Sequence, residues 1–148
     1  MNEGEKRKEF EYLEEHTADV AFIAYGRDFN EAFANAAKAM FNVMTDITKV
    51  EKKEFRKIEV EDEDLKGLLK KWLEELLFYF DAEGIIFSDF KVEIRKENDK
   101  WILKGVAYGE PFDFEKHTSG LEVKAVSYHW MEIGEKNGEK FVRLILDI

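Results

Sequence analysis

The stretch Gly134-Glu135-Lys136-Asn137-Gly138-Glu139-Lys140 decides how the second half of the chain folds. Asn-Gly is the strongest short signal for a β-hairpin, because both residues tolerate the positive φ angles of a type I′ turn. The segments on either side, residues 121–131 and 141–147, are rich in apolar and β-branched side chains. We therefore predict two antiparallel strands that meet at Asn137-Gly138.

The segments before this hairpin alternate between strand and helix patterns. We predict strands at residues 10–13, 20–25, 55–60, 85–94 and 101–108. Apolar residues at helical spacing follow Asp28, a good N-cap, and again follow residues 62–64, until Gly84 ends the second helix. With no linker or repeat, this order predicts a single α+β domain over residues 1–148, with mainly antiparallel sheets, two packed helices and a frayed terminus at residues 1–9.

Composition restricts the class of protein. Thirteen phenylalanines, five tyrosines and three tryptophans in 148 residues suffice for a packed core, and the absence of cysteine excludes disulfides and thiolate chemistry. The first residues are charged and no run of ~18 apolar residues occurs, so we expect neither a secretory signal nor a membrane span, and a cytoplasmic protein. A net charge of −10 disfavours strong nucleic-acid or membrane binding and suits cations or a basic protein partner.

A second informative stretch is His16-Thr17-Ala18-Asp19, between two predicted strands. A histidine and a carboxylate three residues apart could bind a metal ion or transfer protons, and they could equally form a polar turn. The hairpin adds a possible partner, since pairing outward from Asn137-Gly138 sets Tyr128 opposite Asp147 and His129 opposite Leu146. Asp147 and Ile148 then offer a side-chain carboxylate, a carbonyl and a terminal carboxylate, which are donors for a hard cation.

Several segments resemble the archease family, and together they cover nearly the whole chain. They are Phe-Glu-Tyr-Leu-Glu-Glu-His-Thr-Ala-Asp-Val at residues 10–20, Glu-Ala-Phe at 31–33 with Ala-Ala-Lys-Ala-Met-Phe at 36–41, Trp-Leu-Glu-Glu-Leu-Leu-Phe at 72–78, Val-Lys-Ala-Val-Ser-Tyr-His at 123–129 and Leu-Asp-Ile at 146–148. Ser127 stands where the family usually has threonine, which keeps the hydroxyl group.

The resemblance implies an accessory protein of the RtcB-type tRNA-splicing ligase. That ligase joins RNA ends bearing a 2′,3′-cyclic phosphate or 3′-phosphate to 5′-hydroxyl ends, and an archease promotes its guanylylation, its multiple turnover and its use of other nucleotides. The family binds a divalent cation at an acidic tip, which matches Asp19, Asp147 and Ile148 here. Calcium, manganese and magnesium all remain open. Lys124 matches a lysine linked to activity.

From the residues alone, purely structural roles for these candidate site residues stay open. Asp19 could cap a turn, His16 could bind the metal, orient Asp19 or tie the turn together, and Lys124 could be an ordinary solvent-facing lysine. No cysteine, Gly-Xaa-Ser-Xaa-Gly elbow or phosphate-binding glycine loop is present, so we expect no catalytic residues and a protein that is not itself an enzyme. The alternatives are a metal-dependent phosphoester hydrolase and a general chaperone-like binding module.

Overall fold

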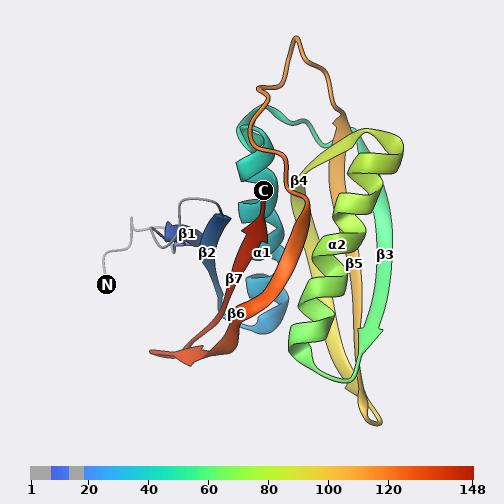
Figure 1. Ribbon diagram of the computed structural model, residues 1–148. Helices are drawn as coiled ribbons and strands as arrows, with labels where there is room; N and C mark the ends of the chain where they lie inside the picture. The colour runs from blue at the N-terminus through green and yellow to red at the C-terminus, as the bar shows by residue number, and fades with distance from the viewer. Residues whose placement is uncertain (1–7, 14–18) are drawn as a thin grey trace, which may run out of the picture.

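The computed structural model describes residues 8–13 and 19–148 (Figure 1). The elements in chain order are β1 (Phe10–Leu13), β2 (Asp19–Gly26), α1 (Phe29–Met44), the short 3-10 helix η1 (Ile47–Lys49), β3 (Glu54–Asp62), α2 (Leu65–Glu83), β4 (Ile85–Glu97), β5 (Lys100–Pro111), β6 (Ala125–Lys136) and β7 (Glu139–Asp147). The predicted α+β class, with antiparallel strands and two helices, is confirmed.

The strands form two separate sheets. One has the order β1-β2-β7-β6 and the other has the order β3-β5-β4, and every pairing in both is antiparallel. The first and last strands of the chain therefore share one sheet, in which β2 and β7 are neighbours. This arrangement places the start of β2 beside the end of β7.

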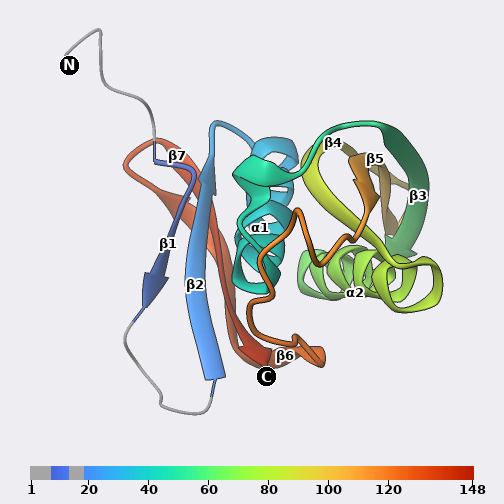
Figure 2. The same ribbon diagram turned by 90° about the horizontal axis from the view of Figure 1, so that it is seen from above.

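Helix α1 lies between the two sheets (Figure 2). The Asp28 carboxylate accepts the Glu31 backbone N–H at 2.9 Å, which confirms the predicted N-cap. Small side chains let both sheets approach the helix closely, and most of its surface is buried, as expected for a helix covered on two sides. Its buried residues are Ala32, Phe33, Ala34, Asn35, Ala36, Ala37, Ala39, Met40, Phe41 and Met44.

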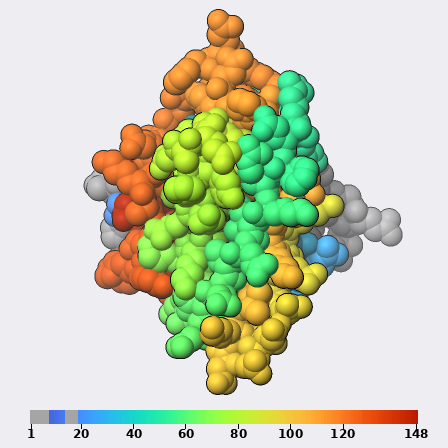
Figure 3. Space-filling model, turned by 90° about the vertical axis from the view of Figure 1, so that its right-hand side faces the viewer, coloured from blue at the N-terminus to red at the C-terminus, as the bar shows by residue number. Residues whose placement is uncertain are grey.

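Helix α2 packs against β3, β5 and β6 and so also bridges the two sheets (Figure 3). Asp64 caps its start by accepting the Gly67 N–H at 2.7 Å, and Gly84 ends it with a left-handed φ of 68°. The Trp72 indole N–H donates to the Phe33 carbonyl at 3.1 Å, which links the two helices inside the core. One hydrophobic cluster runs through both helices and both sheets.

The final hairpin confirms part of the predicted register and corrects the rest. Asn137 and Gly138 have φ angles of 54° and 79°, as a type I′ turn requires, and Gly134 faces Phe141. Beyond Glu132 the register shifts, so Asp147 faces Ala125 and not Tyr128, and His129 does not face Leu146. The prediction failed because a large bulge interrupts β6 between Ser127 and Glu132.

Two further boundaries differ from the prediction. The strand expected from residue 121 begins only at Ala125, and the preceding residues are held by loop contacts in place of a ladder. At the N-terminus, the Glu9 carbonyl accepts the Tyr25 N–H at 2.9 Å and its carboxylate pairs with Lys38, so Glu9 is held against the sheet. Fraying therefore does not extend to Glu9, and residues 1–7 lie outside the described part.

Candidate functional site

The strand register places Asp19 directly opposite Asp147. They are the first pair of the β2–β7 ladder, at the end of the sheet away from the Asn137-Gly138 turn. Figure 2 shows the start of β2, the chain end and the start of β6 together at that end. The predicted association of Asp19 with Asp147 is thus confirmed. The predicted pairing of Tyr128 with Asp147 was wrong.

Both carboxylates project from the same face of the sheet. Directly opposed residues in an antiparallel pair share a face, and their Cβ atoms lie about 4.5–5.5 Å apart. The neighbouring pair, Val20 and Leu146, packs into the core, so Asp19 and Asp147 point away from α1. Asp147 is exposed and Asp19 is half-buried, which leaves the pair open to a solvent-borne ligand.

Lys124 and Ile148 lie beside this pair, and we call the four residues Asp19, Lys124, Asp147 and Ile148 the acidic tip. The Lys124 backbone N–H donates to the Asp147 carbonyl oxygen at 2.8 Å, which fixes Lys124 next to the chain end while its side chain stays exposed. Ile148 packs its side chain against the core cluster. That packing holds the main chain at the end of β7 in a defined place.

The remaining candidate of this group, His16, lies outside the described residues. Within residues 8–13 and 19–148, no three histidine, aspartate or glutamate side chains gather closely enough to hold a metal ion. The donors that the structure brings together at the tip are therefore two carboxylates and neighbouring main-chain oxygens. These are hard oxygen ligands, which suit Ca²⁺, Mg²⁺ or Mn²⁺ and not a soft metal.

The two other histidines differ in burial, and only His117 has the hydrogen bonds of a structural residue. His117 is buried and its Nδ1 accepts the Asp113 backbone N–H at 2.9 Å, so its proton lies on Nε2, which donates to Glu110 at 3.0 Å. His129, expected to be a satisfied structural histidine, is exposed and stacks on Trp130 with ring centroids 4.9 Å apart. The structural histidine is therefore His117.

Glu110 is the centre of a buried polar network that sequence reasoning did not identify. Burial raises the pKa of this carboxyl, but the Glu51 backbone N–H, the Lys116 ammonium and His117 all donate to it and together lower its pKa to about 2. The carboxylate thus ties β5 to the segment before β3 and to the loop at residues 112–124. That loop leads on to Lys124.

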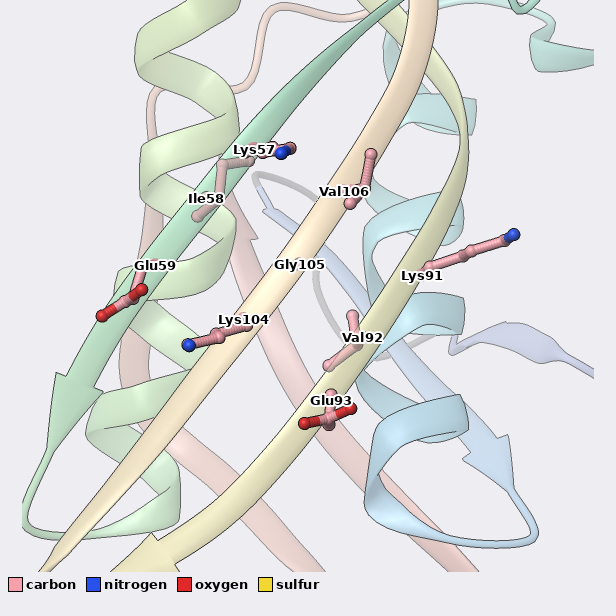
Figure 4. Close-up of a pocket in the computed structure, with 9 residues that line it drawn as sticks. All are labelled: Lys57, Ile58, Glu59, Lys91, Val92, Glu93, Lys104, Gly105 and Val106. Carbon is pink, nitrogen blue, oxygen red and sulfur yellow. The ribbon is translucent and has the colours of Figure 1, made fainter.

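A hollow of about 600 Å³ lies on the outer face of the second sheet (Figure 4). Its lysines do not converge, because Lys57 and Lys91 point away from Lys104 in the close-up. In the ladder, Lys104 lies between Glu59 and Glu93, so the charges alternate across the strands. Such a pattern is typical of a solvated sheet face, and the hollow is on a different sheet from the tip.

The sequence pattern of the archease protein family (MTH1598/TM1083) matches residues 10–148. The chain belongs to the archease family. Proteins named archease from Sulfurisphaera tokodaii and Pyrococcus furiosus are 47% and 49% identical over 95% and 90% of this chain, which corresponds to 99% and 95% of their own lengths. The predicted resemblance is therefore confirmed.

Solved structures support the archease fold. The solution structure of protein 1598 from Methanobacterium thermoautotrophicum has a TM-score of 0.83 and 48% identity, and covers 95% of this chain and 99% of its own. A crystal structure from Thermotoga maritima, described as an archease and possible chaperone, has a TM-score of 0.58 at 16% identity, covering 97% and 98%. In the described part of this archease, no helix is long and apolar enough to cross a membrane.

Proposed function

We propose that this archease activates an RtcB-type RNA ligase, and that a divalent cation at the acidic tip serves that activation. The ligase joins RNA ends bearing a 2′,3′-cyclic phosphate or 3′-phosphate to 5′-hydroxyl ends in tRNA splicing. The archease promotes guanylylation of the ligase and its repeated turnover, broadens its use of nucleotides and is not itself an enzyme. It acts in the cytoplasm.

The observation that carries this proposal is the direct pairing of Asp19 with Asp147. Like charges placed opposite each other destabilise a sheet, so two opposed aspartates at the end of a ladder need a compensating role. A divalent cation supplies that compensation, because its charge neutralises both carboxylates at once. Ile148 contributes main-chain oxygens beside them.

The charge of the chain supports a protein partner. A net charge of −10 complements a basic RNA-binding cleft and speeds encounter with it, while it repels free RNA. Lys124 adds one exposed cation beside the two carboxylates, where it would contact the ligase or its nucleotide. The tip thus presents both signs of charge within a small area.

The test is multiple-turnover ligation of labelled RNA ends by the ligase, with and without this protein. We expect stimulation by the wild type, strong loss with Asp19→Ala or Asp147→Ala, and partial loss with Lys124→Ala. Glu93→Gln, an exposed acid on the second sheet, is the matched control and should stimulate fully. Full stimulation by both aspartate variants would show that the proposed tip is wrong.

Two other outcomes would replace the proposal. Chelator-sensitive hydrolysis of a phosphoester by the protein alone would favour a hydrolase that uses Asp19 and Asp147 to activate water. Stimulation of unrelated enzymes, independent of both aspartates, would favour a general chaperone-like module.

A further inference from the structure

The bulge in β6 exposes three consecutive ring side chains, Tyr128, His129 and Trp130, which we call the aromatic bulge. Tyr128 is 54% exposed and Trp130 is 50% exposed. Isolated exposed aromatic residues are common, but consecutive ones on an edge strand are costly to solubility. Their grouping beside the acidic tip therefore requires an explanation.

The backbone of the aromatic bulge is irregular in a way that favours a functional role. Ser127 pairs with Ile145 and Glu132 with Arg143, so residues 128–131 lie opposite the single residue Leu144. Trp130 has a φ of 59°, a left-handed conformation that is unusual for a bulky side chain. Bulges are frequent beside active sites and strained residues gather at functional sites, where they aim side chains outward.

Neighbouring groups hold two of the rings in place. The Lys70 ammonium lies 5.4 Å from the centre of the Tyr128 ring and also donates to the Val126 carbonyl at 2.7 Å. His129 and Trp130 stack with their planes 23° apart. Pre-oriented aromatic side chains lose little entropy on binding, and tryptophan and tyrosine dominate the energetics of protein interfaces.

A purely protective bulge would look different. β6 is an edge strand of its sheet, and edges are usually shielded by lysine, proline or an inward charge. Here the bulge interrupts the ladder but presents two large rings to solvent. The bulge begins at Tyr128, directly after Ser127 and three residues after Ala125, which faces Asp147. The ladder thus places the bulge close in the chain to the residue that faces Asp147, on a strand that packs against α2.

We propose that the aromatic bulge docks onto an arginine-bearing surface of the ligase, next to the cleft that receives the acidic tip. This inference rests on the proposed function and names the contact that gives it affinity. Guanidinium groups stack on tryptophan and tyrosine faces, and the excess negative charge of the chain attracts the same cationic surface. The net charge of −10 favours a basic protein over single-stranded RNA, although RNA bases also stack on aromatic rings.

The test is calorimetric titration of the ligase with the full chain at saturating Mn²⁺. Trp130→Asn removes the ring while asparagine tolerates the left-handed φ, and Tyr128→Ala removes the second ring. Each should raise the Kd about 30-fold, the size of a hot-spot loss. Trp130→Phe, which keeps a ring, should stay within roughly fivefold of wild type. Phe55→Ala, with the same 54% exposure on the second sheet, is the matched control and should stay within about twofold.

Other results would overturn the inference. A Kd within about twofold of wild type for both Trp130→Asn and Tyr128→Ala would do so, and so would loss of single-stranded RNA binding with unchanged affinity for the ligase. Asp147→Asn separates the two proposals, because it should still bind the ligase but fail to stimulate it. If the wild type binds through the aromatic bulge without stimulating ligation, the proposed function fails and the docking surface stands.

Discussion

Replacing Asp147 with asparagine should change stability in opposite directions with and without a divalent cation. Asp147 faces Asp19 in the ladder, so the metal-free wild type carries two like charges at one sheet end. Asparagine has nearly the same shape but no charge. The variant should therefore be more stable than the wild type in chelator and less stable than the wild type with cation.

The magnitude follows from the geometry. Opposed like charges cost roughly 0.2–1 kcal/mol in a sheet, with the lower part of this range expected because Asp147 is exposed and salt screens the pair. A cation at 100 times its Kd stabilises the folded wild type by about 2.7 kcal/mol. The cation term is the larger of the two, so the order of stabilities should reverse.

The measurement is the free energy of unfolding in urea, in chelator and in saturating Ca²⁺ or Mn²⁺. Glu93→Gln is the matched control, because Glu93 is an exposed strand acid that faces Lys104 and not another acid. The control should show no stabilisation in chelator and the same response to cation as wild type. If Asp147→Asn responds to cation as strongly as wild type, the paired carboxylates do not bind it.

Three further predictions concern the buried network at Glu110 and the packing and capping of α2. Glu110→Ala leaves the His117 and Glu51 N–H donors without their acceptor and should lower the free energy of unfolding by about 2–4 kcal/mol in urea at pH 7. Because the pKa of Glu110 is lowered from 4.5 to about 2, its contribution is full above pH 4.5 and is lost as pH falls through 2, so the gap to wild type must narrow there. Gly105→Ala places a methyl group 2.6 Å from the Trp72 ring and should cost about 1–3 kcal/mol, measured by urea unfolding followed through tryptophan fluorescence; an unchanged midpoint would contradict this packing. Asp64→Ala removes the cap of α2 and should cost about 1 kcal/mol by the same assay, and a neutral result would mean that the cap is dispensable.

Local signals in the sequence were sufficient for most of the fold. Asp28 and Asp64 begin helices, Gly84 ends one, and Asn137-Gly138 makes the hairpin turn, because each of these residues acts through its own backbone conformation or nearest neighbours. The division of the strands into two sheets was not predictable in this way. It depends on which strands α1 separates, and that is a property of tertiary packing.

The candidate site was predictable only in part. The family resemblance identified Asp19 and Asp147, and the β2–β7 register explains why they meet. The pairing register extended from Asn137-Gly138 failed beyond Glu132, because no residue type in 128–131 signals a bulge. Trp130 has a positive φ, which a bulky residue rarely adopts. The network at Glu110 was not predicted from the sequence. Its partners are the Glu51 backbone N–H, Lys116 and His117, and no spacing pattern in the sequence links these groups to Glu110.

The most direct test of the acidic tip is the rate of ligase guanylylation with radiolabelled GTP, measured at limiting divalent cation. We predict that the wild-type protein accelerates the reaction, and that Asp19→Asn and Asp147→Asn bind the ligase but accelerate it little or not at all. Glu93→Gln should act as wild type. Equal acceleration by wild type and both aspartate variants would contradict the claim that the paired carboxylates of the acidic tip serve the activation.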